Sequence, residues 1–446
     1  MFKKVEVWIL YLTILIGILF SIFFGVLVRQ ELVGEVKLGP VSRAALYIAE
    51  LPTSMKSYLL GQTVINRFPS LSGFYGDPVI EELYLLLSKY DGDLQEGVVE
   101  LIDLRTFKIL HSWNPDIDLL NSLIDTTNEE FKYLQRDSSN KRSLLVHPIL
   151  LNNGELMFGW EAPLRKIDSC SNLIWQNADN NFHHSIEVDH EGNIWVSGYL
   201  YPTSIPIEKV GKAFKDDAIV KISPKGKVLF QKSVSEILIE NDMEYLLFSI
   251  GTVGFDSDPI HQNDIQPVNR TTSFWEKGDV FISLANQSMI LLYRPSANKI
   301  IWKGTGHTYY QHDVDILDEH RISIFNNNSK SFSAGNLVDG NNEVIIYDFK
   351  TNLYTSYLKE SLVREDVRTF SQGTSQILNN GDLFIEETNS ARTLFFNADG
   401  SLRWQHINRA NNGNVYNVGW SRILYDSEDI KRVNKFLDSK KECVNE

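Results

Sequence analysis

His184-Ser-Ile-Glu-Val-Asp-His-Glu-Gly-Asn-Ile-Trp-Val-Ser197 is the stretch that decides the fold, because its pattern returns twice further along the chain. In each copy a histidine begins a run of acidic and apolar residues, which leads through a short turn into a second β-rich run. The two later copies begin at His261 and His312. A repeat that returns a histidine to one position predicts imidazoles that converge on one axis, as a propeller with a central site requires.

The repeat continues beyond the histidines. In four places a turn residue precedes a β-rich run, at Asn193, Asp279, Arg321 and Asp382. A second apolar run follows each of them. With the similar stretches 97–113 and 147–175, this makes about six units over roughly 330 residues, close to the size per blade of four-stranded propeller repeats. The sequence therefore predicts an all-β fold, a six-bladed β-propeller over residues 96–426.

The ends of such a ring must pair, because an open sheet edge invites unwanted pairing. The stretch 416–425 is expected to supply the closing strand beside the first unit, 97–113. Trp175, Trp302 and Trp404 are expected to pack between blades, as large aromatic side chains usually do.

The N-terminus predicts a membrane anchor. Residues 7–28 are apolar and carry no formal charge, and this length suffices for a helix that crosses a bilayer. The run is longer than the core of a typical signal peptide and ends without an obvious cleavage site, which favours an uncleaved anchor over a signal peptide. Lys3 and Lys4 outnumber Arg29, so the propeller is expected on the extracytoplasmic side, periplasmic or extracellular.

Four segments result from this interpretation. Residues 1–28 are a cytoplasmic tip and single-pass transmembrane anchor, and 29–95 are a short helical stalk broken at Pro52. Residues 96–426 are the propeller, and 427–446 are a charged C-terminal tail.

Composition limits the partners. The 446 residues contain 43 lysines and arginines against 57 aspartates and glutamates, a net charge of −14. With no basic stripe, this balance argues against nucleic-acid binding. An anionic substrate must therefore be attracted by a local positive site and not by the overall field. Cys170 and Cys443 lie far apart in the sequence and have neither metal-ligand nor redox spacing.

The histidines occupy one slot when they are counted from the turns. His184 and His312 each stand nine residues before a turn residue, where the following unit has Gly373. His261 stands 18 residues before its turn residue, which indicates an insertion centred on 268–275. Since the innermost strand of each blade lines the channel of a propeller, we expect the three imidazoles to face one another there.

Two other interpretations of the histidines remain open. Three imidazoles can bind a metal ion, and Asp264, Asp313 and Asp315 lie near them in the sequence, but metal sites need carboxylate partners and tight geometry. A lone histidine is more often structural, and this is the expectation for His183, His190, His307 and His320. The prediction is a site without metal and without cofactor.

Five short motifs give the histidines a chemical context: His261-Gln-Asn-Asp, Gly278-Asp-Val-Phe-Ile-Ser-Leu-Ala-Asn, Lys299-Ile-Ile-Trp, Gln311-His-Asp and Asn380-Gly-Asp-Leu-Phe-Ile-Glu-Glu-Thr-Asn. In their order and spacing they resemble the arylsulfotransferase family of exported six-bladed propellers, over residues 177–425. The resemblance implies transfer of a sulfuryl group from an aryl sulfate donor to a phenolic or hydroxyl acceptor. It also implies a sulfated histidine as the intermediate and no nucleotide sulfate donor.

The resemblance also implies roles for single residues. By motif, His312 matches the family's nucleophile, and His184 matches its first active-site histidine. His261 and Asn263 match its His-x-Asn pair. A neutral imidazole can attack the sulfur of an aryl sulfate because aryloxide is a good leaving group. His261, Asn263 and His184 are then expected to hold the sulfuryl oxygens or to handle the phenol proton.

One position departs from the family pattern. The family has an arginine in the strand after the His-x-Asn unit, where this chain has Ala285. Loss of a guanidinium removes a bidentate contact to sulfate oxygens. Arg270 and Arg392 are the expected substitutes as substrate-binding residues.

Ala285 also keeps open an alternative from another class, a catalytically degenerate propeller that serves as a membrane-anchored binding module in the cell envelope. A metal-dependent hydrolase is the third alternative. The four residues that match the family favour the transferase. The expected partners are a small-molecule donor, a small-molecule acceptor and the membrane; no nucleic acid is expected, and no oligomeric state is predicted.

Overall fold

The structure is a computed structural model that describes residues 6–32, 38–60, 62–249, 255–333, 335–439 and 443. The chain divides into an N-terminal unit that ends at Gly61 and a larger unit that begins at Gln62.

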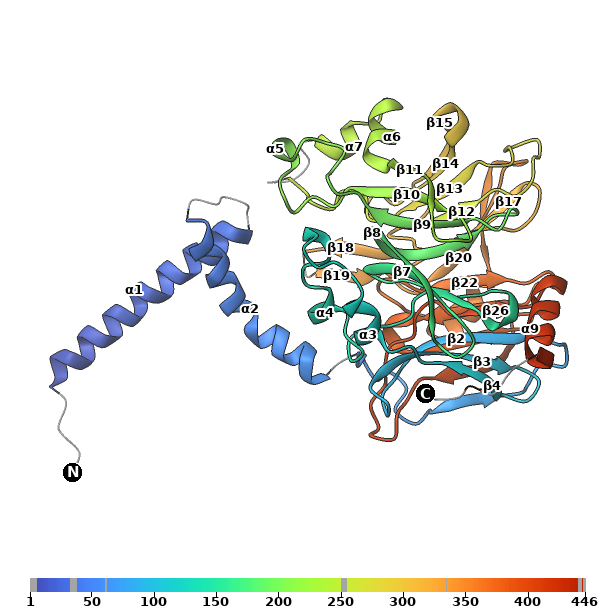
Figure 1. Cartoon of the computed structure of the whole chain (residues 1–446), viewed down its shortest axis with the longest axis horizontal. Helices are drawn as coiled ribbons and strands as arrows, with labels where there is room; N and C mark the ends of the chain where they lie inside the picture. Colours follow the sequence, from blue (N-terminus) through green and yellow to red (C-terminus); the bar gives the residue numbers. More distant parts are fainter. Residues whose placement is uncertain are drawn as a thin grey trace. The chain divides into compact units, whose positions relative to one another are not determined.

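Two helices make up the described part of the N-terminal unit (Figure 1). α1, Val7–Leu32, exposes apolar side chains along most of its length, and its stretch Val7–Gln30 is long and apolar enough to cross a membrane. By length and composition it fits a single-pass anchor or a signal sequence. α2, Pro40–Leu60, continues through Pro52 without the predicted break. A proline removes one helix hydrogen bond, while the turns on either side of it keep theirs.

The larger unit is built of antiparallel sheets in which chain neighbours pair (Figure 1). One sheet contains β2 (Tyr84–Asp91), β3 (Glu96–Asp103), β4 (Lys108–Trp113) and β26 (Arg422–Leu424). A seven-stranded sheet contains β5 (Ile149–Leu150), β6 (Leu156–Phe158), β7 (Ala162–Ile167), β8 (Leu173–Val188), β9 (Ile194–Tyr199), β10 (Asp217–Ile222) and β11 (Val228–Ser233).

Three further sheets and a hairpin follow. The next sheet contains β12 (Gln262–Pro267), β13 (Val280–Leu284), β14 (Met289–Arg294) and β15 (Lys299–Thr305). Another contains β16 (Val314–Ile316), β17 (Arg321–Asn326), β20 (Glu343–Asp348) and β21 (Leu353–Tyr357), with the hairpin β18 (Ser329–Phe332) and β19 (Gly335–Val338) inserted. The last contains β22 (Thr374–Ile377), β23 (Leu383–Glu387), β24 (Arg392–Phe396), β25 (Leu402–Ile407) and β1 (Gly73–Gly76).

The helices of this unit lie between strands, except for the longest, α9, which follows the last strand. They are α3 (Ile117–Ser122), α4 (Leu134–Asp137), α5 (Ile207–Val210), α6 (Val234–Glu240), α7 (Tyr245–Phe248), α8 (Lys359–Arg364) and α9 (Ser427–Ser439). The unit is thus an all-β, propeller-like fold, as predicted, and the blade number of six stays a prediction. Apolar cores lie between neighbouring sheets; one joins Ile219 of β10 to Ile265 and Ile282 of the following sheet.

Chain ends pair as predicted. β26 lies beside β2, with Leu424 opposite Tyr84, so the end of the chain completes the sheet that its beginning starts. β1 lies beside β25 in the same way. Residues 73–91 therefore belong to the sheets and not to the stalk that was expected over 29–95. The consecutive residues Leu85, Leu86 and Leu87 are all fully buried, because β2 packs against a core on each of its faces.

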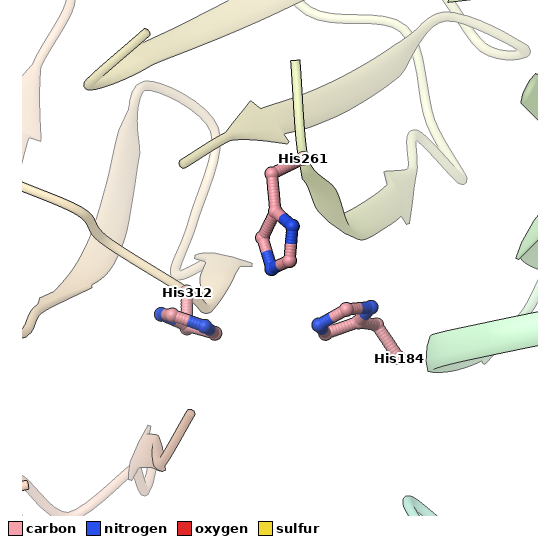
Figure 2. A group of neighbouring side chains, drawn as sticks. All are labelled: His184, His261 and His312. Carbon is pink, nitrogen blue, oxygen red and sulfur yellow. The ribbon is translucent and has the colours of Figure 1, made fainter. Parts of the chain in front are cut away.

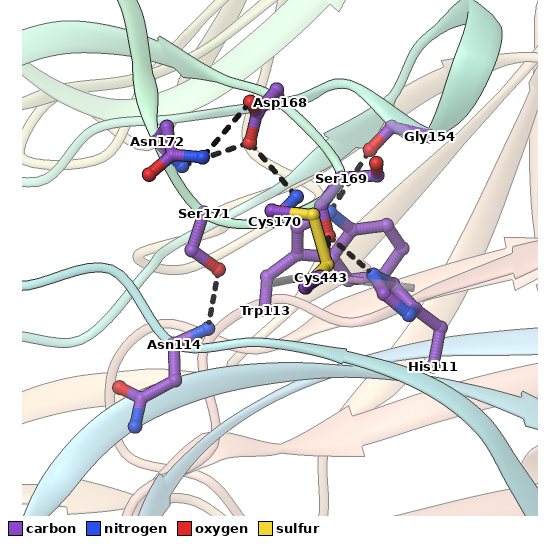
Figure 3. The surroundings of a disulfide bond; sticks show 10 residues. All are labelled: His111, Trp113, Asn114, Gly154, Asp168, Ser169, Cys170, Ser171, Asn172 and Cys443. Carbon is purple, nitrogen blue, oxygen red and sulfur yellow. Dashed lines mark hydrogen bonds between the residues drawn. A yellow bond between two sulfur atoms is a disulfide. The ribbon is translucent and has the colours of Figure 1, made fainter. Parts of the chain in front are cut away.

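The C-terminal segment is anchored and is not a free tail. α9 places Val433 and Phe436 in a core, with the Phe436 ring stacked 6.0 Å from Trp113 of β4. Beyond α9, Cys443 forms a disulfide with Cys170 in the turn between β7 and β8 (Figure 3). The spacing of the two cysteines gave no sign of this pairing, because a bond across 273 residues depends on the tertiary fold.

Candidate active site

Three histidines from three successive inner segments meet in the larger unit (Figure 2). His184 belongs to β8, His261 directly precedes β12, and His312 lies shortly before β16. One nitrogen of each ring faces the others, and these three atoms all lie within 4.8 Å of one another. His184 and His312 are buried, whereas His261 is half-buried. The predicted convergence of the imidazoles is therefore found, and their catalytic roles stay predictions.

The backbone explains why these side chains turn inward. His184 and His261 have left-handed φ angles of 58° and 51°. His147, Tyr310 and Trp420, which precede other inner strands, share this conformation with φ of 48°, 56° and 58°. Side chains other than glycine adopt it at a cost, and they keep it where the surrounding structure requires it. A left-handed residue before the inner strand is therefore a repeated device of this fold.

The same angles correct the predicted common slot. Tyr310, and not His312, is the left-handed residue of its unit, so Tyr310 corresponds to His261. His312 stands two residues later, in the place that Asn263 has after His261. The nine-residue spacing to the turn misaligned this unit, because the strands and loops between slot and turn differ in length. The three imidazoles converge from two kinds of position.

His312 has a defined tautomer. Its Nδ1 lies 2.8 Å from Asn327 Oδ1 and 3.1 Å from the Tyr310 carbonyl oxygen, which are both acceptors. The Asn327 Nδ2 donates to the Thr369 and Gln372 carbonyls, which fixes the orientation of the amide. Nδ1 must therefore carry the proton, and Nε2 keeps its lone pair. Burial and the nearby His261 lower the pKa of His312 to about 3, so its ring is neutral near pH 7.

His261 is paired with a carboxylate. Its Nδ1 lies 2.8 Å from Asp258 Oδ2, and Lys215 Nζ lies 3.5 Å from the same oxygen. Burial raises the pKa of Asp258, but the His261 hydrogen bond and the Lys215 charge outweigh it and leave that pKa below its usual value. The ionised Asp258 thus accepts a hydrogen bond from the Nδ1–H of His261. Such a pair orients the ring and stabilises it when it is protonated.

His184 is backed by a second histidine. The Nδ1 atoms of His183 and His184 are 2.8 Å apart, and His183 Nε2 lies 3.3 Å from Asp217 Oδ1. Asp217 is fully buried, and burial together with the Asp258 charge raises its pKa to about 8. Burial lowers the pKa of His183 to about 3 and that of His184 well below its usual value. His183, expected to be structural, is thus in direct contact with the cluster.

Aromatic rings enclose the three histidines. Trp160 and Trp420 meet His184 edge to face, at 5.0 and 6.0 Å between ring centroids. Tyr310 lies 5.2 Å from the His312 ring and 6.0 Å from the His261 ring. Aromatic rings therefore border the histidines in addition to their hydrogen-bond partners.

Asn263 is fully buried near this segment of the chain. Its Nδ2 donates to the Gln311 carbonyl at 3.0 Å, and its Oδ1 accepts no hydrogen bond within the described part of the chain. The amide therefore presents an unused acceptor as well as its second N–H.

The two arginines that were expected to replace the missing guanidinium have other partners. Arg392 is buried in β24, where it is bonded to Glu387 and lies over the Phe68 ring. Arg270 is exposed and lies 3.9 Å from Glu319. Both guanidinium groups are thus engaged with partners other than the three histidines, whereas Lys215 lies beside Asp258, the partner of His261. Ala285 is buried, and its backbone N–H donates to the His261 carbonyl.

Two of the acidic residues near the histidines in sequence bind the backbone of neighbouring inner strands. Asp264 Oδ2 accepts from the Val314 backbone, and Asp313 Oδ2 accepts from the Ser375 backbone, each from the following inner strand. The three histidine nitrogens are close enough to hold a metal ion. Within the described residues, the groups close enough to share such an ion are these histidines alone, without a carboxylate.

Sequence reasoning missed the partners that set the state of each ring. Asn327, Asp258 and Asp217 reach the histidines through tertiary contacts, and no motif marks them. The adjacent pair His183-His184 is the one signal in the sequence. In a regular strand two neighbouring side chains face opposite sides, so a contact between these two rings requires an irregular backbone. The left-handed φ of His184 and the register shift of β8 between His183 and Ile186 bring the two rings together.

Comparison with known proteins gives one family. The model of the family described as arylsulfotransferase (ASST) matches residues 147–409, which is more than half of the chain. A search of curated proteins found no match. Similar solved structures include a protein of unknown function from Bacteroides caccae, 12% identical, which covers 78% of this chain and 100% of its own at a TM-score of 0.47.

Two further solved structures are more distant. The WD40 domain of Neurospora crassa Pan2 is 9% identical and covers 78% of this chain and 90% of its own, with a TM-score of 0.38. A virginiamycin B lyase from Staphylococcus aureus is 11% identical and covers 59% of this chain and 70% of its own, with a TM-score of 0.33. The family match includes all three converging histidines, and by its extent this chain belongs to the arylsulfotransferase family.

Proposed function

We propose that this protein transfers a sulfuryl group from an aryl sulfate to a phenolic or hydroxyl acceptor, with His312 as the residue that carries the group. Family membership supports an arylsulfotransferase-like activity. The observation that carries the finer proposal is the tautomer of His312. Two oxygen acceptors hold the proton on Nδ1, so the lone pair of Nε2 is available as a nucleophile, and burial keeps the ring neutral.

Transfer then takes two balanced steps. In the first, His312 Nε2 forms a bond to sulfur, and the bond between sulfur and the aryl oxygen breaks with its electron pair on the aryloxide. In the second, the acceptor oxygen attacks sulfur, and the N–S bond breaks and returns the lone pair to Nε2. The aryloxide takes up a proton in the first step, and the acceptor hydroxyl gives one up in the second.

His261 is the group that suits the proton transfers. Asp258 accepts a hydrogen bond from Nδ1–H and stabilises the ring when both nitrogens are protonated. That ring can give its Nε2 proton to the aryloxide in the first step, and its neutral form takes a proton from the acceptor hydroxyl in the second. His184 and Asn263 are then left to hold the sulfuryl oxygens. Lys215 supplies positive charge near His261 in place of the arginine that Ala285 replaces; Arg270 and Arg392 are engaged elsewhere.

The propeller is proposed to have six blades. The seven-stranded sheet supports this number if β8, which has 16 residues, ends one blade and begins the next. β8 pairs with β7 mainly through its first half and with β9 through its second half.

The propeller is further proposed to lie outside the cytoplasm, anchored by α1. The Cys170–Cys443 disulfide supports this location, because such bonds persist mainly in oxidising compartments.

Intact-mass measurement tests the transfer directly. The protein is incubated with 4-nitrophenyl sulfate without acceptor, and one sulfuryl group is expected to remain on the protein and to map to His312. His312→Ala is expected to release no nitrophenol and to gain no mass. His307→Ala is the matched control, because His307 is exposed and stacks on Tyr354. A protein that binds phenols but never gains this mass contradicts the transferase and favours the second candidate.

That second candidate is the binding module. The observation that favours it is Ala285, since the family's arginine is absent from a site that otherwise keeps its histidines. Retained binding of aryl sulfates without any covalent step is the result that would identify it.

A further inference from the structure

A pocket of 720 Å³ lies beside Tyr310 and the hairpin β18–β19. Its apolar wall consists of Tyr309, Tyr310, Phe332 and Phe370. Tyr310 stacks 6.2 Å from Phe370 in this wall, and the same ring lies 5.2 Å from His312. One end of the pocket therefore reaches the ring that borders the proposed nucleophile.

Ala285 contributes to the space. It lines the pocket together with Ser288, and its side chain ends at one methyl group. An arginine at this position has a long side chain, which fills part of the volume that alanine leaves open. The hairpin β18–β19 forms another side, where Lys330 reaches into the lining and is held by Asp339 at 2.7 Å.

We propose that this pocket binds the aromatic rings of a large phenolic substrate, a polyphenol of two or more rings with hydroxyl substituents. This proposal rests on the proposed function for the placement of the reacting oxygen near His312. Pockets of about 300–1,000 Å³ enclose ligands much larger than phenol. Flat rings can stack on Tyr310 and Phe370, and the serine hydroxyls and Lys330 of the lining suit hydroxyl groups.

Direct binding tests the pocket without any need for transfer. Calorimetry on the full-length protein in detergent compares 2-naphthol with phenol, and tighter binding of 2-naphthol by about tenfold or more is expected. Phe332→Ala is expected to weaken 2-naphthol binding by about 3- to 10-fold. Leu337→Ala is the control, because Leu337 is equally exposed on the same hairpin and does not line the pocket.

Two results overturn the pocket: equal affinity for both phenols, or a Phe332→Ala variant that binds 2-naphthol as the unchanged protein does. Phe332 is 47% exposed, so its replacement is not expected to disturb folding. Because binding is measured without a sulfate donor, a protein that binds 2-naphthol in this pocket but fails to transfer contradicts the proposed function and not the pocket.

A second inference follows from the chain of groups behind His184. Asp217, His183 and His184 form a buried series: the two Nδ1 atoms of the histidines are hydrogen-bonded at 2.8 Å, and Asp217 Oδ1 lies 3.3 Å from His183 Nε2. These last two atoms have no hydrogen-bond partner within the described residues, so each is free to pair with the other. The exposed fractions are 0%, 1% and 5%, so water does not compete for these contacts. Two neighbouring imidazoles that share a proton between Nδ1 atoms cannot both donate; the state of one ring fixes that of the other.

We propose that Asp217 and His183 are positioning residues that make His184 Nε2 a hydrogen-bond donor toward the sulfuryl oxygens. The protonated Asp217 donates to His183 Nε2, the His183 Nδ1–H donates to His184 Nδ1, and the proton of His184 stays on Nε2. This arrangement carries no net charge, which deep burial favours. When Asp217 loses its proton, both hydrogen bonds reverse, the His184 proton moves to Nδ1, and Nε2 becomes an acceptor.

Some of the groups around this series raise the pKa of Asp217, and others lower it. The pKa of Asp217, raised to about 8, is affected by its neighbours Asp258, His261 and Lys215 and by the Gln262 backbone. Tyr199 stacks on His183 with 4.1 Å between ring centroids, and Lys215 Nζ lies 5.3 Å from the centroid of the Tyr199 ring. Burial is the largest of these influences, and it favours the protonated carboxyl near neutral pH.

Nitrogen NMR of histidine-labelled protein reads the tautomer of His184 directly, with its signals identified by their loss in His184→Gln. We expect the Nε2–H form at pH 6.5 and a change to the Nδ1–H form above about pH 8. Asp217→Asn keeps an N–H donor toward His183 and loses the titrating proton, so the Nε2–H form is expected at every pH. His320→Gln, a change at a half-buried histidine paired with Asp318, is the control.

An Nδ1–H form at pH 6.5 overturns the relay, and so does a change of tautomer that persists in Asp217→Asn. Neither result depends on catalysis. The expected tautomers in a protein that never accepts a sulfuryl group support the relay and contradict the proposed function, so the two failures are distinguishable.

Discussion

At the scale of the residue, three chemically identical side chains acquire three different roles through the partner of one nitrogen. Nδ1 of His312 faces neutral oxygens, Nδ1 of His261 faces a carboxylate, and Nδ1 of His184 faces another imidazole. The neutral acceptors leave the Nε2 lone pair of His312 available as a nucleophile, and the carboxylate stabilises His261 as a protonated acid. The neighbouring imidazole couples the tautomer of His184 to the protonation of the buried Asp217. The three proposed roles are thus set by the partners of the histidines and not by the three rings that the motifs identify.

Replacement of Asp258 tests the role of His261. Asp258→Asn removes the charge that stabilises protonated His261, so proton donation to the leaving aryloxide becomes harder. Stopped-flow measurement of the first step should show a loss of about 10²-fold for phenyl sulfate and a much smaller loss for 4-nitrophenyl sulfate, whose leaving group needs little protonation. Asp242→Asn, which changes an exposed carboxylate, is the control. Equal losses for both donors contradict the assignment.

Restoring the guanidinium tests the position of Ala285. Ala285→Arg places a bidentate donor in the pocket lined by Tyr310, whose ring borders His312, and from there the guanidinium is expected to reach the sulfuryl oxygens. Turnover of 4-nitrophenyl sulfate is expected to rise by about 10-fold, while binding of 2-naphthol weakens because the pocket is partly filled. Ala285→Leu adds bulk without charge and should show the weaker binding alone. Unchanged turnover in the arginine variant indicates that Lys215 already supplies the charge.

At the scale of the element, the sequence predicted most of the strands and the closing pair, because turn residues and alternating runs are local signals. Arg321 begins β17, and Asp382 directly precedes β23, as the turn positions predict. The errors arose where tertiary structure decides. The expected stalk includes the strand around Leu85, although two flanking cores bury that strand. The spacing to the turn also aligns His312 with His261, whereas Tyr310 holds the corresponding backbone position.

The pairing of β1 with β25 buries His406, which predicts that the stability of the fold depends on pH. His406 of β25 lies opposite Phe74 of β1, with 4.6 Å between the rings, and burial followed by the Lys89 charge lowers its pKa to about 3. The unfolded chain takes up this proton near pH 6.5, whereas the folded chain does not. Stability from His406 is therefore complete above pH 6.5 and falls as the pH drops toward 3.

Denaturant unfolding measures this effect. His406→Phe removes the titrating group, so the variant should lose less unfolding free energy than the unchanged protein between pH 6.5 and 4, by about 2–3 kcal/mol. His190→Phe is the comparison, because His190 is exposed at the surface and lies 3.6 Å from Glu191. Parallel pH dependences of the His406→Phe variant and the unchanged protein would refute the assignment.

At the scale of the whole molecule, the two ends of the chain secure the larger unit in different ways. β26 completes the sheet of β2, and α9 then packs Phe436 against His111 and Trp113 before Cys443 reaches Cys170 (Figure 3). His111 Nε2 also lies 2.8 Å from the Ser169 carbonyl, next to the disulfide. The covalent bond therefore holds the C-terminal segment on a surface that already binds it through packing.

The disulfide serves as a reporter of the compartment in which the propeller folds. If α1 is an anchor with the propeller outside the cytoplasm, as proposed, Cys170 and Cys443 are oxidised in the cell, since the cytosol keeps such thiols reduced. Protein alkylated during lysis, without reductant, is expected to show no added alkyl group by intact mass, and two after reduction under denaturing conditions. Because the chain contains these two cysteines and no others, no other thiol adds to the count. Alkylation of both cysteines without reductant means that the propeller faces the cytosol, and the proposed orientation of the anchor is then wrong.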